Sequence, residues 1–221
     1  EVTQRIPVQH IDKDFYKFFP FSRSNQNKFC LFYHRFFDVG TAIIGMVFFG
    51  LSIPLISLLN LVANRGPLFY KQERVGKNGN TFSIMKYRTM VPNAEAAGAQ
   101  WAQKNDKRIT PFGKFLRKTR IDEIPQFYNV LKGEMSIIGP RPERPVFVKE
   151  LSEIIPFYET RHVVKPGLTG WAQVNTEYGS TLAGSLEKLQ YDLYYIKHRS
   201  FYLDVSIILK TLSTVLFYRG Q

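Results

Sequence analysis

Two adjacent carboxylates, Asp122 and Glu123, follow the cations Arg117 and Arg120 in the run RKTRIDEIPQ (residues 117–126). An ionised aspartate can attack phosphorus as a nucleophile, and a neighbouring carboxylate can hold a divalent cation that neutralises phosphate oxygens. Nearby cations favour the ionised form of a carboxyl group and also attract phosphate. The residue types therefore indicate phosphoryl transfer at this pair.

The pattern around the pair predicts the start of a helix. Pro125 has no N–H and is tolerated in a first helical turn, and apolar residues recur every three or four positions from Ile124 to Leu131. Asp122 is then expected at the N-cap, where the helix dipole favours its charge. The alternative is that Asp122 only caps the helix and Glu123 is a solvated acid, which is the commoner role of such residues.

Charge and composition limit the classes of partner. The chain has 221 residues and a net charge of +12, with aromatic residues at 15%. Such a charge indicates nucleic acid, an anionic membrane surface or phosphorylated substrates as partners. No helix-turn-helix, zinc or ribonucleoprotein signature is present, so no nucleic-acid partner is expected. Cys30 is the only cysteine, which excludes a disulfide framework, and the start at Glu1 suggests that an upstream region is missing.

A long apolar stretch predicts insertion into a lipid bilayer. Residues 39–63 contain no charged side chain and would cover roughly 37 Å as a helix. Pro54 bends such a helix, and Ser52 offers a polar group beside the bend. Basic residues flank both ends, which places both ends in the cytoplasm. The residues alone leave open a re-entrant helix-break-helix and an ordinary kinked span.

The rest of the chain is expected to alternate short strands, loops and helices. Strands at 68–75 and 81–88 should form a hairpin with Lys86 and Arg88 on one face, where they could grip a phosphate or be merely solvated. Further elements are predicted as follows: a helix at 91–103, a turn with a short strand and a stiff loop within 132–142, a helix at 145–161, and helices at 182–196 and 201–218.

Two loops are candidates for ligand binding. Pro140 and Pro142 flank Arg141 and should hold its guanidinium in a stiff loop suited to phosphate, although a purely structural turn is the alternative. The glycine-rich loop at 165–175 carries Trp171, which could wall a ligand pocket. Aromatic residues crowd the ends of the last two helices, as in helices that lie in a lipid headgroup interface, with core packing as the alternative.

Three stretches together resemble the bacterial sugar transferases, the monotopic phosphoglycosyl transferases. They are KYRTM (residues 86–90), RKTRIDEIPQFYNVLKGEMSIIGPRP (117–142) and KPGLTGWAQVN (165–175). The resemblance runs from about Arg35 to the C-terminus with the motifs in the family's order. Residues 176–179 resemble the exopolysaccharide-type branch.

The resemblance implies a reaction, a cofactor and a location. A sugar-1-phosphate, with a hexose such as glucose or galactose as the plausible sugar, passes from a UDP-sugar to undecaprenyl phosphate with release of UMP. This is the first membrane step of exopolysaccharide, capsule or O-antigen synthesis, and it requires Mg²⁺. The enzyme lies in the bacterial inner membrane with its catalytic domain on the cytoplasmic face. A homodimer is left open.

The resemblance also implies residue roles. Asp122 is the nucleophile that forms a covalent phosphosugar intermediate, and Glu123 is its partner, with both expected at the metal. Arg117 would face the lipid phosphate, while Lys86 and Arg141 would hold substrate phosphates or the nucleotide. The remaining candidate substrate-binding residues are Arg88, Arg120, Gln126, Pro140, Pro142 and Trp171.

The family's re-entrant helix breaks at a Ser-Pro pair, which favours the helix-break-helix here. This chain has Ile53-Pro54 with Ser52 one place earlier. We therefore expect a mostly helical α+β monotopic membrane protein with a small β-hairpin. Its parts are a lead-in (1–34), a re-entrant membrane helix (35–64) and a catalytic domain (65–221). The competing interpretations are a glycosyltransferase that releases UDP and a non-enzymatic membrane-anchored binding protein.

Overall fold

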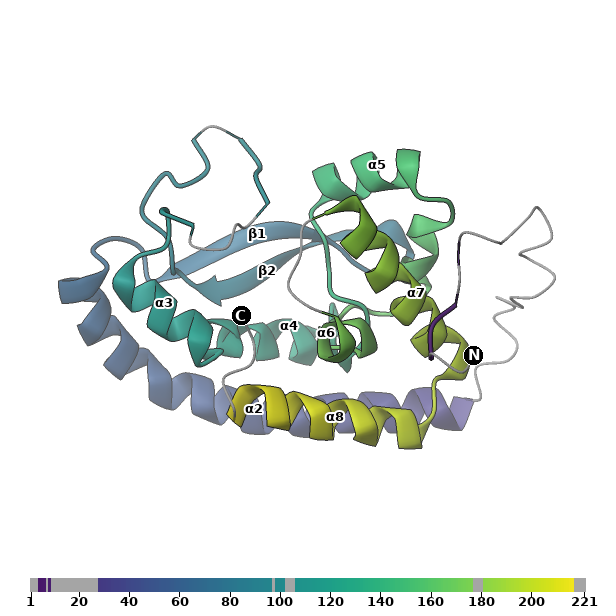
Figure 1. Ribbon diagram of the computed structural model, residues 1–221. Helices are drawn as coiled ribbons and strands as arrows, with labels where there is room; N and C mark the ends of the chain where they lie inside the picture. Colours follow the sequence, from purple (N-terminus) through teal and green to yellow (C-terminus); the bar gives the residue numbers. More distant parts are fainter. Residues whose placement is uncertain are drawn as a thin grey trace.

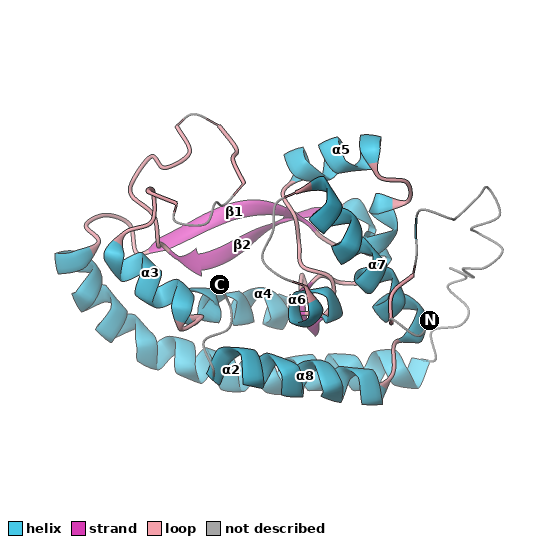
Figure 2. Cartoon of the chain, viewed as in Figure 1, coloured by secondary structure: helices cyan, strands magenta, loops and turns pink. Residues whose placement is uncertain are grey.

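The computed structural model describes residues 4–6, 8, 28–96, 98–101, 106–176 and 181–216. Within these residues the fold is mostly helical, with small sheets and one long helix along one side (Figures 1 and 2). The predicted α+β class is confirmed at this level. Most of the predicted lead-in, residues 177–179 of the branch motif, and Phe217 and Tyr218 lie outside the described residues.

The long helix α2 spans Lys28–Ala63 and contains Pro54. It is continuous and curves toward the hairpin at its C-terminal end (Figure 1), so the predicted division into two helices is not present, and the re-entrant course stays a prediction. Near the proline, Ser52 Oγ donates to the Phe49 carbonyl oxygen at 2.8 Å and lies 2.7 Å from the Tyr87 hydroxyl. The expected polar support for the bend is therefore present at Ser52.

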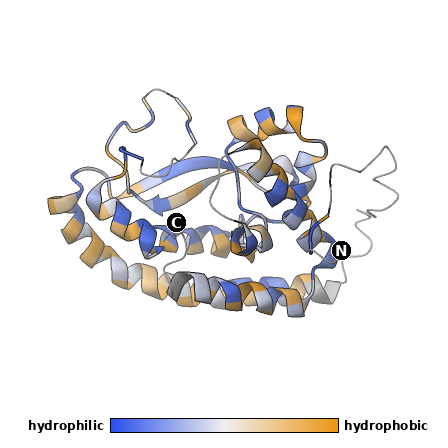
Figure 3. Ribbon diagram, viewed as in Figure 1, coloured by the Kyte–Doolittle hydropathy of each residue, from blue (hydrophilic) through white to orange (hydrophobic). Residues whose placement is uncertain are grey.

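Helix α2 is mostly apolar (Figure 3), and many of its large apolar side chains are exposed. The segment Leu31–Ala63 is long and apolar enough to cross a membrane, judged by length and composition. Its exposed large side chains include Ile43, Ile44, Val47, Phe48, Leu51, Leu55, Leu58, Leu61 and Val62. A helix in the core of a water-soluble domain would bury these side chains, so their exposure is consistent with membrane association.

The predicted hairpin is confirmed. Strands β1 (Phe69–Val75) and β2 (Thr81–Tyr87) are antiparallel, with Phe69 opposite Tyr87. Asn78 and Gly79 adopt positive φ in the 3₁₀ turn η3 (Lys77–Gly79), which closes the tip of the hairpin. Phe49 of α2 contacts the rings of Phe69 and Tyr87, so the hairpin packs on the second half of the long helix.

The segment that carries the acidic pair is a 3₁₀ helix between two α-helices. The elements are α3 (Pro111–Lys118), η4 (Ile121–Gln126) and α4 (Phe127–Lys132). Arg120, with φ of 58°, holds the N-cap position of η4, and its left-handed conformation turns the chain out of α3. The prediction that Asp122 is an N-cap is therefore wrong, since Asp122 lies inside η4 and α4 begins only after Pro125.

A second sheet consists of two parallel strands, β3 (Ser136–Ile138) and β4 (Gly167–Thr169). Between them lie α5 (Pro145–Ile154) and the 3₁₀ helix η5 (Tyr158–Val163), and the short helix α6 (Trp171–Asn175) follows β4. The loop predicted at 165–175 thus contains a strand and a short helix. Its glycines permit close approach, because a Cβ on Gly167 would overlap the backbone of Gly139.

Two helical predictions were wrong in extent. The helix predicted at 145–161 stops at Ile154, because Pro156 cannot continue it and Phe157 turns the chain with φ of 61°. Of the helix predicted at 91–103, the described residues form turns instead. There Asn93 has φ of 62°, and Trp101 stacks on Phe147 with ring centroids 3.9 Å apart. Tertiary contacts override the helix propensity of the alanines.

The C-terminal helices are α7 (Leu182–His198) and α8 (Phe201–Leu216). Helix α7 belongs to the core, where Leu189 and Leu193 are fully buried. Helix α8 lies beside α2 (Figure 1) and buries Ile207, while Tyr202 is 82% exposed. Core packing thus describes α7, and α8 combines a buried face with an exposed apolar one.

Candidate active site

Glu123 is held by two cations at one oxygen. Its Oε1 accepts from Lys86 Nζ and from Arg141 Nη2, each at 2.8 Å, and the residue is only 8% exposed. Burial alone would raise the pKa of Glu123, but the charges of Arg141 and Lys86 outweigh it and hold the pKa well below its usual range. Glu123 is therefore ionised throughout the physiological pH range.

Asp122 lies in a different environment. It is buried, and its Oδ1 has no hydrogen-bond partner within the described structure. Burial and the charge of Glu123 raise the pKa of Asp122 to about 6. Three cations act in the opposite direction without outweighing burial: Lys86, Arg117 and Arg120. Two adjacent carboxyl groups thus have pKa values displaced in opposite directions, a pattern typical of reacting groups.

Gln126 adds an unpaired donor to the same helix. It is 2% exposed, and its Nε2 has no partner among the described residues. A buried amide and a buried carboxylate oxygen that both lack partners cost stability unless a ligand or water pairs with them. Asp122 and Gln126 therefore offer one acceptor and one donor for a ligand.

The loop that presents Arg141 is anchored at three successive carbonyl oxygens. Pro140 O accepts from Gly167 N at 2.9 Å, and Pro142 O accepts from Arg74 Nη1 at 3.1 Å. Arg141 O accepts from Arg161 Nη2 at 3.0 Å. Together with the fixed φ angles of the two prolines, these bonds hold the backbone of Arg141 while its guanidinium reaches Glu123. The predicted stiff loop is confirmed.

Arg117 and Arg120 lie near enough to Asp122 to act on its charge. Arg117 Nε donates to Thr89 Oγ1 at 2.9 Å, which connects α3 to the end of the hairpin. Gly113 makes this approach possible, because a Cβ there would overlap the Thr89 backbone. Thr89 is a supporting residue that the sequence analysis missed.

Two predicted binding residues lie elsewhere. Arg88 is 7% exposed and donates to the carbonyl oxygens of Asn64, Pro67 and Met90, so it connects the end of α2 to the hairpin. Its backbone partners give it a structural role, and the expectation that it grips a phosphate is not supported. Trp171 is 3% exposed in a hydrophobic core cluster, with Lys210 Nζ 4.3 Å from its ring centroid.

Asn129 and the pair Arg161–Asp192 were also missed. Asn129 Oδ1 accepts from Met85 N at 3.2 Å and its Nδ2 donates to Ser83 O at 2.8 Å, so α4 is fixed to β2. Arg161 Nη2 also donates to Asp192 Oδ2 of α7 at 2.7 Å, and both side chains are buried. No local pattern in the sequence predicts these contacts, because the two partners of each contact lie tens of residues apart.

The comparison with protein families shows to which family the chain belongs. The model of the family described as bacterial sugar transferase matches residues 29–218. The chain belongs to this family. The match includes the long helix, the hairpin, the acidic pair and both C-terminal helices, so the family resemblance predicted from three motifs is confirmed.

Individual bacterial sugar transferases agree with this. The chain is 46% identical over 185 residues to the UDP-N-acetylgalactosamine-undecaprenyl-phosphate N-acetylgalactosaminephosphotransferase of Aeromonas hydrophila, covering 84% of the chain and 44% of that protein. It is 47% identical over 160 residues to the putative undecaprenyl-phosphate N-acetylgalactosaminyl 1-phosphate transferase of Bacillus subtilis, covering 72% of the chain and 86% of that protein.

The name of a third relative specifies another sugar. The chain is 40% identical over 160 residues to the UDP-glucose:undecaprenyl-phosphate glucose-1-phosphate transferase of Escherichia coli, covering 71% of the chain and 34% of that protein. The chain therefore spans less than half the length of the Aeromonas and Escherichia relatives and most of the length of the Bacillus one.

The site can accept a divalent cation only with help from a ligand. Among the described residues no group of three or more His, Cys, Asp or Glu side chains could hold a metal ion. Mg²⁺, however, is commonly bound by one or two carboxylates, with water and substrate phosphates completing six oxygen ligands. Asp122 and Glu123 supply two adjacent carboxylates for such an arrangement.

The raised pKa of Asp122 predicts a pH-dependent difference in stability. A carboxyl group whose folded-state pKa lies above its unfolded value of 3.8 destabilises the fold as pH rises through about 6. In Mg²⁺-free buffer, Asp122→Asn should therefore gain stability relative to the wild type between about pH 5 and pH 7. Denaturant titrations in detergent at both pH values measure this, and a difference that does not change with pH would contradict the assignment.

Proposed function

We propose that this chain forms the catalytic site of a phosphoglycosyl transferase. It would transfer a sugar-1-phosphate, with a hexose as the favoured sugar, from a UDP-sugar to undecaprenyl phosphate and release UMP in exopolysaccharide, capsule or O-antigen synthesis. The observation that carries the proposal is the buried, unpaired Oδ1 of Asp122 beside a Glu123 fixed by Lys86 and Arg141. The names of the relatives support the substrates.

In the first step, Asp122 Oδ1 attacks the phosphorus atom of the phosphate group that carries the sugar. A new P–O bond to the carboxylate forms, and the bond to the UMP oxygen breaks with its electron pair remaining on UMP. Glu123 keeps Lys86 and Arg141 beside the reacting phosphate, where their remaining N–H groups can stabilise its charge. Gln126 Nε2 supplies a further donor.

In the second step, an oxygen of the lipid phosphate attacks the same phosphorus atom. The bond to Asp122 breaks, the carboxylate is regenerated, and a lipid-linked diphosphate sugar leaves. Arg117, positioned by Thr89, is the proposed partner of the lipid phosphate. Bound Mg²⁺, held by Asp122 and Glu123, would neutralise oxygens of the substrate phosphates.

Product analysis tests the reaction class. Purified protein in nanodiscs with Mg²⁺, a panel of UDP-sugars and undecaprenyl phosphate should release UMP and form a lipid-linked sugar diphosphate. Release of UDP would assign the chain to glycosyltransferases that move the sugar alone. Absence of any nucleotide product with every donor would favour a non-enzymatic membrane protein.

The membrane segment is proposed to be re-entrant, with the catalytic part on the cytoplasmic face of the bacterial inner membrane. The bend in α2, its exposed apolar surface and the basic residues at both ends support this. A helix that returns to the same face would keep the acidic pair and the lipid phosphate in one compartment.

Labelling of single cysteines tests the topology. Native Cys30 and an Arg65→Cys substitution in a Cys30→Ser background should both react with an impermeant maleimide only in inside-out vesicles. In a Pro54→Leu background the helix should straighten, and one of the two sites should become accessible from the periplasm. Opposite accessibility of the two sites in the chain that keeps Pro54 would mean that α2 spans the bilayer.

A further inference from the structure

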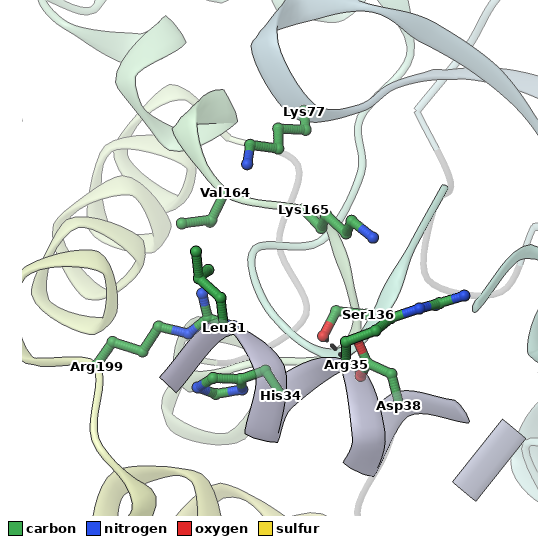
Figure 4. A pocket seen from close by; sticks show the side chains of 9 residues that line it. All are labelled: Leu31, His34, Arg35, Asp38, Lys77, Ser136, Val164, Lys165 and Arg199. Carbon is green, nitrogen blue, oxygen red and sulfur yellow. Dashed lines mark hydrogen bonds between the residues drawn. The ribbon is translucent and has the colours of Figure 1, made fainter. Parts of the chain in front are cut away.

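A second cluster of cations surrounds a small cavity far from the acidic pair. The cavity has a volume of about 70 Å³, and side chains from several segments line it (Figure 4). Its charged or polar lining includes Arg35, Asp38, Lys77, Ser136, Lys165 and Arg199. They come from the first turns of α2, the hairpin tip, β3, the residues before β4 and the α7–α8 connection, so the fold assembles the cluster from distant parts of the sequence.

The acidic residue of the cavity is already engaged. Asp38 Oδ1 accepts from Ser136 Oγ at 2.9 Å, drawn as a dashed line in Figure 4, and from Ile137 N at 2.8 Å. Arg35 donates to the carbonyl oxygens of Val130 and Leu131, both at 2.9 Å, which terminates α4. These contacts explain Asp38 and Arg35 as structural groups.

Lys77 and Lys165 have no comparable structural contact among the described residues. Lys77 is exposed and Lys165 is half-buried, and within the described part of the chain the ammonium group of neither forms a hydrogen bond or an ion pair. Burial lowers the pKa of Lys165, and the charge of Arg35 lowers it further. Lys165 and Arg199 act on the engaged carboxylate of Asp38, and Arg199 also acts on Asp204. The four cations of the lining outnumber these two carboxylates, so the cavity retains an excess of positive charge that an anion would neutralise.

The cavity is separate from the reacting centre. Lys77 lies at the hairpin tip, whereas Lys86 lies near the opposite end of β2 and binds Glu123. At about 3.3 Å per residue, β2 alone separates Lys86 from the tip by roughly 17 Å. A phosphate in the cavity could not react with Asp122.

Leu31 of α2 lines the cavity and is 41% exposed, and α2 and the adjoining start of α8 carry further exposed aromatic side chains. Phe32 and Phe36 of α2 are 70% and 73% exposed, and Phe201 and Tyr202 at the start of α8 are 63% and 82% exposed. Tyr33 contacts Phe201 with ring centroids 5.6 Å apart, which confirms that these segments adjoin. A ligand with a phosphate in the cavity could lay apolar chains against this surface.

We propose that this cavity binds the phosphate group of an anionic membrane phospholipid, distinct from the lipid substrate. The size of the cavity suits one phosphate group and is too small for a nucleoside, and exposed Leu31 in its lining, with exposed Phe201 in the adjoining segment, favours a lipid over free phosphate. Binding there would fix the start of α2 and the α7–α8 connection at the headgroup level of the membrane.

Lipid binding to a charge-neutralised variant tests this. Delipidated full chain in detergent is titrated with phosphatidylglycerol, and occupancy is followed by native mass spectrometry. Lys77→Gln/Lys165→Gln should weaken binding at least about tenfold, because two charged contacts to phosphate are lost. The matched control Lys107→Gln/Lys149→Gln removes the same charge from exposed positions and should stay within about twofold of the wild type.

Three results would overturn the proposal. They are unchanged phosphatidylglycerol binding in the Lys77/Lys165 variant, equal affinity for zwitterionic phosphatidylcholine, and binding of inorganic phosphate without binding of phosphatidylglycerol. UMP release in nanodiscs of phosphatidylcholine alone should be the same in this variant as in the wild type. Its loss there would place the two lysines in the reaction instead. Because lipid occupancy is measured without donor sugar, its outcome is independent of the proposed reaction.

Discussion

Asp122→Asn is expected to reduce turnover at least about 10³-fold, because the amide cannot form the bond to phosphorus that the carboxylate forms. The substitution keeps the size of the side chain and removes a charge that burial disfavours. Folding stability near neutral pH should therefore be equal to or higher than that of the wild type. Steady-state UMP release, measured together with denaturant unfolding in detergent, separates the two effects.

A capping aspartate would give the opposite result. Its replacement would cost about 1 kcal/mol of stability and leave the chemistry largely intact. Glu123→Gln serves as the matched comparison, since it removes the neighbouring charge that Lys86 and Arg141 share but leaves the proposed nucleophile in place. It should retain measurable turnover, whereas equal residual activity in both variants would contradict a special role for Asp122.

Asp192→Leu is expected to lower the free energy of unfolding by about 3–5 kcal/mol, because it leaves the charge of Arg161 buried without a partner. The double variant Arg161→Met/Asp192→Leu should recover most of this loss, since it removes both charges. Glu187→Gln, which breaks the exposed ion pair with Arg5, is the control and should cost less than about 1 kcal/mol.

The same double variant separates stability from positioning. Arg161 Nη2 donates to the carbonyl oxygen of Arg141, so its removal frees one of the three anchors of the loop at 140–142. UMP release should stay reduced about tenfold even where stability recovers, because misplacement of a phosphate-binding guanidinium weakens charge stabilisation. Full activity in the stable double variant would show that Arg161 has no positioning role.

The chemistry of the site was predictable because its main residues are close in sequence. Asp122 and Glu123 are adjacent, and the upstream cations Arg117 and Arg120 lower the pKa of Asp122 as expected. Burial and the charge of Glu123 nevertheless outweigh them, so the expected preference of Asp122 for its ionised form is wrong. The prolines that flank Arg141 predicted a stiff loop. The alternating side chains of two short segments, separated by turn-forming residues, predicted the hairpin. These features depend on local conformation, which a sequence specifies directly.

The predictions that the structure does not support and the contacts that the sequence analysis missed share another cause. Arg88 has the same spacing as Lys86 along one strand face, yet it lies past the end of β2, where the carbonyl groups after α2 take its donors. The backbone of Asp122 follows the left-handed turn at Arg120, for which the sequence contains no glycine signal. The contacts of Trp171 and Arg161 depend on chain segments far away in sequence, so tertiary packing decides their roles.

Intact-protein mass measurement without a lipid acceptor tests the proposed mechanism most directly. Purified protein is mixed with Mg²⁺ and a panel of UDP-sugars, and UMP and the protein mass are quantified together. The expected result is a near-stoichiometric burst of UMP and a hexose-phosphate adduct that peptide mapping places on Asp122. UMP that appears only after undecaprenyl phosphate is added, with no adduct under any donor, would mean direct transfer and would contradict the role of Asp122 as nucleophile.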